Sequence, residues 1–302
     1  MRSGARLGAG LLAVSLGCWL LAAAGPAAAS SGGQLAPPFI GLVSPQGIAV
    51  DAHGDVFVAD TGNNRIVELP AGATSYQQQR ILPFTGLGLT GLAGPSAVAV
   101  DARGDVFVAD SGRNRVVELP AGATSSSQQR VLPFTGLNFP AGIAVDRRGD
   151  VYVADTGNNR IVELPAGATS SSQQRVLPFT GLRLPEGVAV GAGGSVFAAD
   201  TYGNRVVELP AGATSSSQQH VLPFTGLAGP SGLAVDTHGN VYVADFGNGR
   251  VVELPAGATR PGQQVTLSFT GLYNPFGVAV SAHGDVFTVD YFSGKVAELP
   301  RR

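Results

Sequence analysis

Acidic and basic residues recur as pairs, five positions apart, along this 302-residue chain. The acid ends an apolar run such as Val-Phe-Val-Ala-Asp, and the base follows a turn-forming segment such as Thr-Gly-Asn-Asn. These groups could form a ring of metal ligands, or each pair could lock its own hairpin. Sixfold repetition favours the hairpin pairs, because a substrate site rarely needs six copies of one group, and an exposed pair contributes under about 1 kcal/mol. The expected pairs are Asp60 with Arg65, Asp110 with Arg115, Asp155 with Arg160, Asp200 with Arg205, Asp245 with Arg250, and Asp290 with Lys295.

A second acidic series lies in Asp-x-x-Gly turns, where the carboxylate could bind a cation or cap the turn. Capping of backbone N–H groups is the favoured interpretation, because Asp side chains commonly accept such bonds in turns. Gly191 and Ser281 break the series, which excludes a ring of six ligands. The four acids of this series are Asp51, Asp101, Asp146 and Asp236.

The histidines decide the case for a metal enzyme. His53, His238 and His283 share one turn position, whereas His220 begins a strand at a place where other copies carry Arg. Zinc requires three or four converging ligands, so we expect solvated turn residues rather than a metal site. No histidine and acid recur beside the many serines, and we therefore expect no catalytic residue, no metal and no cofactor.

These residues are positioned by a repeat of about 45 residues, which dominates the chain. Its steps are 50, 45, 45, 45 and 45 residues, and the first is longer because residues 88–92 form an insertion. One unit contains four strand-like segments, at residues 47–51, 55–60, 65–69 and 80–85. Four short antiparallel strands in a unit of this length predict one blade of a β-propeller. The proline that opens each unit stands at Pro45, Pro95, Pro140, Pro185, Pro230 and Pro275.

The two ends of the repeat array predict how the ring closes. The last unit stops after its third strand, and its missing fourth strand is found before the first unit, where residues 38–42 match residues 133–137 at the same distance from the next opening proline. An N-terminal strand that completes the last blade would protect an otherwise open sheet edge. We therefore expect an all-β, six-bladed β-propeller of four-stranded antiparallel blades, closed by this strand.

Residues 1–29 have the order of a secretory signal peptide. Arg2 and Arg6 precede an uncharged stretch at residues 7–24, and three alanines end the segment. We assign residues 1–29 to the signal and 30–302 to the propeller, and expect a protein that is secreted or associated with the cell envelope, with no membrane span after cleavage. Two alternatives are an uncleaved anchor and lipidation at Cys18, although Ser15 stands where a lipoprotein signal carries Leu.

The charge balance argues against partners that bind mainly by attracting a strongly basic protein. The full chain has 19 Lys and Arg against 21 Asp and Glu, and loss of two arginines with the signal leaves 17 against 21. The net charge changes from −2 to −4, which removes any strong case for nucleic acid or an anionic membrane. The single Cys lies in the signal, so a disulfide framework and a Cys-rich metal site are excluded.

The repeated phrases resemble the NHL repeat. They are Pro-x-Gly-Ile/Val-Ala-Val-Asp, then Gly-Asp/Asn-Val-Phe/Tyr-Val-Ala-Asp, then Gly-Asn-Asn-Arg-Ile/Val-Val-Glu-Leu, and they cover all six units. The further phrase Val-Leu-Pro-Phe-Thr-Gly-Leu, at residues 131–137, resembles the extracellular sensor propeller of actinobacterial membrane Ser/Thr kinases of the PknD type. The chain has no kinase motifs, so it resembles the sensor head alone. Other propellers similar to this family are enzymes, among them an amidating lyase whose zinc is held by histidines.

Differences between the copies point to a binding face. In a propeller, the hairpin between strands two and three shares a face with the loop that enters each blade, and aromatic residues gather on both in the last three units. Grouped aromatic side chains at loop tips are common anchors of binding patches, although packing between blades, notably by Phe139 and Phe276, is an equal alternative. The expected ligand-binding residues are Tyr202, Phe246, Tyr273, Phe276, Tyr291 and Phe292, with Arg113, Arg183 and Glu186 as a polar rim.

The sequence as a whole favours a secreted binding or sensor module. A rigid loop face would capture a protein, a peptide or a cell-wall glycan, and we expect a monomer. The alternatives are a metal-dependent hydrolase or lyase of the lactonase-like propeller type, and a structural spacer without a specific ligand.

Overall fold

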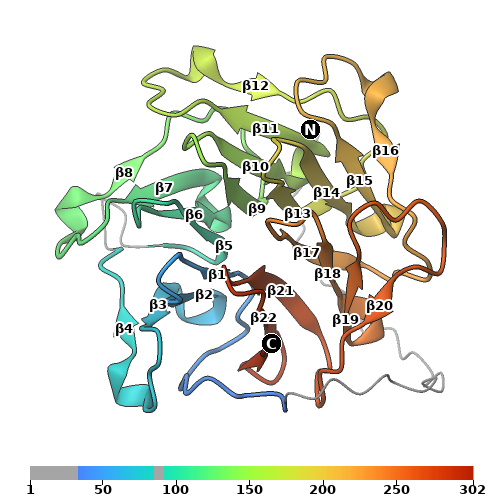
Figure 1. The fold of residues 1–302 in the computed structure, drawn as a ribbon. Coiled ribbons are helices and arrows are strands. Elements are labelled where there is room, and N and C mark those ends of the chain that lie inside the picture. Colours follow the sequence, from blue (N-terminus) through green and yellow to red (C-terminus); the bar gives the residue numbers. More distant parts are fainter. Residues whose placement is uncertain (1–32, 85–91, 302) are drawn as a thin grey trace, which may run out of the picture.

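A ring of six small antiparallel sheets makes up the computed structural model, which describes residues 33–84 and 92–301 (Figure 1). The sheets radiate from a common centre, and the first strand of each lies innermost (Figure 1). Five blades have four strands in chain order and the sixth has three. The predicted all-β, six-bladed propeller is therefore confirmed. The predicted signal at residues 1–29 lies outside the described residues, as does most of the insertion at 88–92.

The strands follow the repeat closely. Blade one holds β1 (Ile48–Val50), β2 (Val56–Asp60), β3 (Arg65–Leu69) and β4 (Arg80–Ile81). Blade two holds β5 (Pro95–Val100), β6 (Val106–Asp110), β7 (Arg115–Leu119) and β8 (Arg130–Val131). Blade three holds β9 (Pro140–Val145), β10 (Val151–Asp155), β11 (Arg160–Leu164) and β12 (Arg175–Val176). Blade four holds β13 (Pro185–Val190), β14 (Val196–Asp200), β15 (Arg205–Leu209) and β16 (His220–Val221). Blade five holds β17 (Pro230–Val235), β18 (Val241–Asp245), β19 (Arg250–Leu254) and β20 (Val265–Thr266). Blade six holds β21 (Pro275–Val280), β22 (Val286–Asp290) and β23 (Lys295–Leu299).

Short 3-10 turns join the strands. Those between strands two and three end on a left-handed residue, such as Asn159 at φ 54°, which reverses the chain into a tight hairpin. No helix in the described part of the chain is long and apolar enough to cross a bilayer. The turns are η1 (Thr61–Asn63), η2 (Tyr76–Gln78), η3 (Ser111–Arg113), η4 (Ser126–Gln128), η5 (Thr156–Asn158), η6 (Ser171–Gln173), η7 (Thr201–Gly203), η8 (Ser216–Gln218) and η9 (Phe246–Asn248).

The hydrophobic core lies between the blades rather than within them. Six clusters of buried side chains each join two consecutive blades, including blade six to blade one. Between blades two and three, for example, Phe107 and Val153 pack together with Leu137 and Phe134 of the connecting segment. Every strand two is buried along its whole length because both of its faces are covered.

The fourth strands are shorter than the predicted segment 80–85. The ladder ends at Leu82, whose N–H donates to the carbonyl of Ile66 at 3.0 Å. Pro83 has no N–H to continue it, and the N–H of Phe84 turns back to the carbonyl of Leu82 at 2.8 Å. Only a two-residue strand remains at the rim of the blade.

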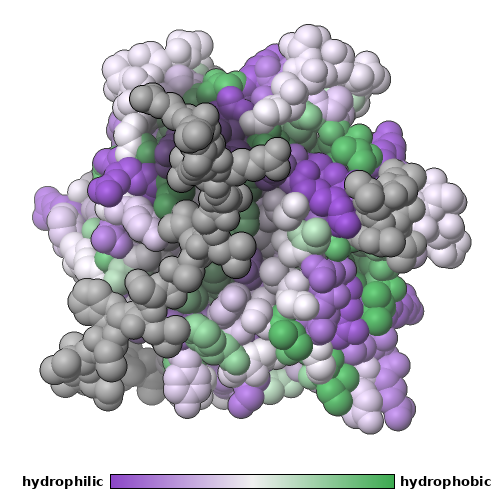
Figure 2. Space-filling view, turned by 180° about the vertical axis from the view of Figure 1, so that it is seen from behind, coloured by the Kyte–Doolittle hydropathy of each residue, from purple (hydrophilic) through white to green (hydrophobic). Residues whose placement is uncertain are grey.

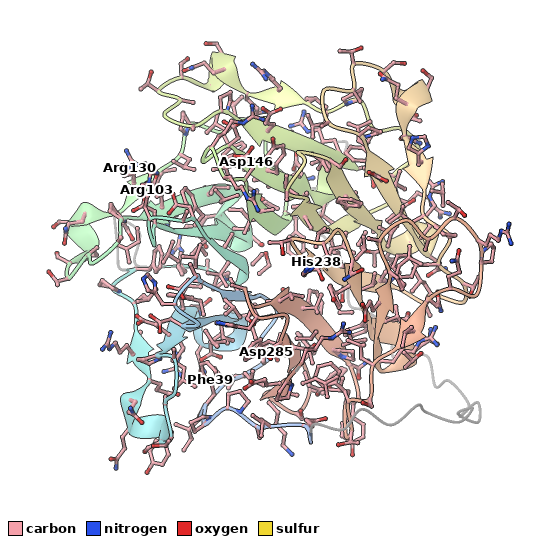
Figure 3. The ribbon with its side chains drawn as sticks, in the orientation of Figure 1. Phe39, Arg103, Arg130, Asp146, His238 and Asp285 are labelled. Atoms are coloured by element: carbon pink, nitrogen blue, oxygen red, sulfur yellow. The ribbon has the colours of Figure 1, made fainter. Side chains whose placement is uncertain are left out.

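The predicted closing strand is not confirmed in the part of the chain that the structure describes. Instead, a single antiparallel bridge joins Leu35 to Glu298, with N–O distances of 2.8 and 3.0 Å. Pro37 stands where Leu82 stands in blade one, and without an N–H it cannot make the next ladder bond. The ring is nevertheless joined here, because Phe39 packs on the core shared by blades six and one. Figure 3 labels Phe39 beside these two blades.

A glutamine clamp supplements five of the junctions between blades in the described part of the chain. The side chain of Gln174 accepts from the Thr135 N–H at 2.9 Å and donates to its carbonyl at 3.2 Å. Gln34 holds Thr270 in the same way, at 2.6 and 3.2 Å, and so links the N-terminal segment to the connection that follows blade five. The same bonds join Gln79 to Ile40, Gln219 to Thr180, and Gln264 to Thr225.

Gly187→Ala tests how closely the blades approach at the centre. A Cβ at Gly187 would lie too close to the Ser231 carbonyl oxygen of the next blade, so the strands must separate. Overpacking of this kind lowers the free energy of unfolding by about 1–3 kcal/mol, which urea denaturation measures. Gly193→Ala is the control, because a Cβ there meets nothing within 4 Å. Equal losses in the two variants would contradict the interpretation.

Candidate functional site

A buried aspartate at the end of each strand two organises the loop face of the propeller. In blade three, Asp155 has 0% exposure, and its Oδ2 accepts from Arg160 Nε at 2.6 Å and from Asn158 Nδ2 at 2.8 Å. Its Oδ1 accepts from the Asn138 N–H of the entry loop at 2.7 Å. One carboxylate therefore ties the hairpin to the entry loop. The 2.6 Å pair recurs between Asp60 and Arg65, Asp110 and Arg115, Asp200 and Arg205, and Asp245 and Arg250.

Two expectations about these pairs need correction. The pairs are not exposed, because each aspartate is fully buried and its arginine is 18–32% exposed. Blade six also differs, because no ion pair joins Asp290 to Lys295 among the described residues, although the two are opposite each other in the hairpin. Burial acts to raise the pKa of Asp290, but hydrogen bonds from Ser293, Asn274 and Tyr273 outweigh it, and the pKa lies below the usual value.

Asp155→Ala tests the buried pair. Removal of one partner leaves the Arg160 guanidinium without its carboxylate and the loop N–H of Asn138 without its acceptor. The expected loss in the free energy of unfolding is about 3–5 kcal/mol, measured by urea denaturation. Lys295→Ala is the matched control, with an expected change within about 0.5 kcal/mol. A loss for Asp155→Ala no larger than that of the control would overturn this view of the aspartate.

A β-bulge in strand one builds a second feature, the mouth of the central channel. In blade four the register of β13 against β14 shifts between Pro185 and Gly187, so Glu186 is the extra residue. Bulges of this kind redirect a side chain. The six residues at this position line one cavity of about 60 Å³ on the propeller axis. We call Gln46, Ser96, Ala141, Glu186, Ser231 and Phe276 the channel-mouth ring.

Glu186 is the titratable member of this ring, and in the described part of the chain no salt bridge joins it to Arg113 or Arg183, the other residues of the expected polar rim. Burial raises the pKa of Glu186 to about 7. Arg113 lies 3.7 Å from Asp110 in blade two. Arg183 is exposed on the entry loop of blade four. Among the described residues no salt bridge involves Glu186, so it is an isolated carboxyl that exchanges its proton near neutral pH.

Glu186→Gln tests this environment. The folded-state pKa lies above the ordinary value of 4.5, so the stability that the neutral acid provides at low pH is lost as the pH rises towards about 7. The wild type should match the variant near pH 4 and be less stable by about 1–3 kcal/mol at pH 8. A ¹³C NMR titration of the Glu186 carboxyl should show a midpoint near 7, and a midpoint near 4.5 would contradict the burial.

Four of the six expected aromatic residues form a continuous row. The ring centroids of Phe246 and Phe276 are 5.7 Å apart, those of Phe276 and Tyr291 are 6.0 Å apart, and those of Tyr291 and Phe292 are 5.0 Å apart. We call these four the aromatic row. It runs from the hairpin of blade five, through the channel mouth, to the hairpin of blade six. Tyr202 makes no ring contact in the described part of the chain and is 62% exposed.

The aromatic row replaces a polar latch between blades. In blade three, the Thr156 hydroxyl donates to the Pro185 carbonyl of the next blade at 2.6 Å, and Thr61, Ser111 and Thr201 act similarly. Phe246 and Tyr291 stand at this position in blades five and six. Phe246 and Phe276 therefore pack between blades. By contrast Phe139, which could have packed there, is 55% exposed, and Phe292 is 70% exposed.

The turn acids cap their own turns, as the sequence indicates. Asp51 Oδ1 accepts from the N–H groups of His53 and Asp55 at 2.8 and 2.9 Å. The His53 ring lies 3.2 Å from Asp51 and its side chain is 81% exposed. In the described part of the chain, no group of three His, Cys, Asp or Glu side chains is placed to hold a metal ion.

Comparisons with known proteins agree with this architecture. The NHL repeat matches residues 42–69, 92–119, 137–164 and 227–254. The chain is a six-bladed β-propeller in which four blades match the NHL repeat. The two blades without a match, blades four and six, are those in which Gly191 and Ser281 replace the turn aspartate. A search of curated proteins finds no match.

Solved structures share the fold at low sequence identity. A streptogramin B lyase aligns with a TM-score of 0.62 at 15% identity, over 88% of this chain and 97% of the lyase. A gluconolactonase from Xanthomonas campestris aligns with a TM-score of 0.65 at 15% identity, over 88% of this chain and 87% of that one. A chain of a nidogen/laminin complex aligns with a TM-score of 0.63 at 21% identity, over 79% of this chain and 85% of that one. These neighbours of similar fold therefore include two proteins named as enzymes and one from a protein complex.

The channel-mouth ring is what sequence reasoning missed. A signal was present, because the middle residue of Pro-x-Gly/Ala varies among Gln, Ser, Ala, Glu and Phe while its surroundings repeat. This residue faces the axis because of the bulge in strand one. Sequence periodicity does not reveal the bulge, so the sequence alone could not place the residue there.

Proposed function

We propose that this NHL propeller is an exported binding module that captures a protein or peptide on its loop face. The aromatic row is the main support for this proposal. Its end at Phe292 is exposed, and Tyr273, on the entry loop of the same blade, is 71% exposed. Rigid aromatic anchors that are already ordered lose little entropy on binding. The nidogen/laminin assembly, a protein complex containing a similar propeller, supports this class of partner.

The shape of the surface supports recognition by anchors rather than by a broad apolar area. In the part of Figure 2 that is drawn in colour, apolar patches are interrupted by polar ones. Partners of such surfaces typically insert a few side chains between exposed rings. Export is the second part of the proposal and is supported by the signal-like order of residues 1–29. A cell-envelope glycan and a role as the sensor head of a kinase system belong to the same proposal.

The enzymatic alternative is a hydrolase or lyase, and Glu186 is the observation that favours it. A carboxyl with a pKa near 7 at the channel mouth could transfer a proton. A metal-dependent reaction would need converging ligands, which the described residues do not supply. Metal content of the purified protein and hydrolysis of gluconolactone in the presence of Ca²⁺ or Zn²⁺ separate the two functions.

Tyr273→Ala combined with Phe292→Ala tests the binding function. Peptides are first selected from a random displayed library against the wild-type propeller, and their dissociation constants are measured by calorimetry. Loss of two exposed anchors should weaken binding by about tenfold or more while the melting temperature stays unchanged. Tyr76→Ala is the matched control, because Tyr76 is 50% exposed on a loop between strands three and four. Selected peptides that bind both variants equally would refute the proposal.

A further inference from the structure

The turn between strands one and two of blade four lacks the side-chain oxygen that its sister turns contain. In blade three, Asp146 Oδ1 accepts from the N–H groups of Arg148 and Asp150 at 2.8 and 2.9 Å. Blades one, two and five repeat this arrangement with Asp, and in blade six a Ser281 hydroxyl replaces it. Blade four has Gly191 at this position, which carries no acceptor.

The backbone of the blade-four turn is nevertheless the same. Gly191 N–H donates to the Ser195 carbonyl at 2.9 Å and Gly194 N–H to the Gly191 carbonyl at 2.8 Å, as in blade three at 3.0 and 3.0 Å. The φ angle is +87° at Gly194 and also at Gly149. The N–H groups of Gly193 and Ser195 therefore occupy the positions of donors that hold a side-chain oxygen in every other blade. Among the described residues, neither of them has an acceptor.

A hollow of about 430 Å³ opens directly over this turn. It is lined by Gly191 to Gly194 of blade four and by the corresponding turns of the two flanking blades, which Figure 3 marks with Asp146 and His238. The missing side chains of blade four are what leave this space. The hollow lies at the opposite end of the propeller from the hairpins and the aromatic row, because its turns join strands one and two.

The charges that line the hollow suit an incoming anion. Arg147 and Arg148 both line it. Arg148 is held by Asp146 at 3.4 Å and by Asp150 at 3.6 Å, whereas Arg147 is exposed and makes no salt bridge in the part of the chain that the structure describes. The second acid of the lining, Asp236, is satisfied by the His238 and Asn240 N–H groups, the Asn240 amide and the Tyr242 hydroxyl. The exposed guanidinium of Arg147 thus shares this hollow with Gly193. Ser195 lines a second hollow of about 460 Å³, which adjoins the first at Gly191 and Gly193.

We propose that this hollow binds a carboxylate of a ligand, which takes the place of the missing aspartate. One carboxylate oxygen accepts from Gly193 N–H and Ser195 N–H, in the geometry that Asp146 shows in blade three, and Arg147 neutralises the charge. Backbone donors arranged in this way are a recognised form of anion site. The chemistry fits a peptide carboxylate or a sugar acid, both of which carry the same group.

Titration of the ¹⁵N-labelled protein with sodium acetate, followed by amide NMR, tests the proposal. Acetate should move the Gly193 and Ser195 amide protons downfield with saturation, whereas sodium chloride at equal ionic strength should not. The amides of Arg148 and Asp150, which already hold a carboxylate, are internal controls. An absence of saturable shifts, or equal shifts with chloride, would overturn the proposal.

Gly191→Asp provides the decisive variant, because it restores the internal carboxylate. The Gly193 and Ser195 amides should then resonate downfield without acetate, and the apparent affinity for acetate should fall by about tenfold or more. Gly191→Ala is the matched control, since its Cβ makes the same 3.3 Å contact with Phe197 but adds no carboxylate, and it should keep the acetate response. Acetate shifts that persist unchanged in Gly191→Asp would refute the site. N-acetylalanine and glucuronate then distinguish a peptide source from a sugar source by which of them binds more tightly.

Discussion

Face-to-face packing of consecutive blades is the constraint on which the rest of this structure depends. Each blade is a small sheet that buries both faces, so its core belongs half to the preceding blade and half to the next. No blade can therefore be stable alone, and the ring must close between blades six and one. Closure is achieved with few hydrogen bonds, since packing of Phe39 and the clamp of Gln34 supplement a single bridge.

Within this ring, the buried aspartates determine the shape of the loop face. Each one joins a hairpin to an entry loop, so two segments that are separate in sequence become one rigid unit. The fully buried carboxylate makes this unit expensive to disturb. The aspartate binds the entry loop through a backbone N–H, so the side chain there can still vary, as Asn138 and Arg183 show. Other differences between copies lie at the hairpin tips, at the bulged residue of strand one and in the turns at the other end.

Those variable positions are where the molecule differs from a symmetric scaffold. At one end, aromatic residues replace a hydroxyl latch on blades five and six, and a single carboxyl faces the axis from blade four. At the other end, blade four loses the acid that its sister turns use and opens a hollow with unpaired donors. A rigid frame with local substitutions at both ends is well suited to recognition, because the binding groups are ordered before a ligand arrives.

The sequence alone determined the fold, the number of blades and the register of each hairpin, because these depend on contacts between residues a few positions apart that repeat six times. It also identified the acid–base pairs, with Lys295 as the exception. Only the tertiary structure decided that the aspartates are buried, that Pro37 limits the closing contact to a single bridge, and that Glu186 lines the channel mouth without a salt bridge among the described residues. The physical reason is that the closed ring determines which segments become neighbours. Those neighbours decide whether a side chain is buried, where a bulged side chain points and whether a donor finds an acceptor, and local periodicity contains no information about them.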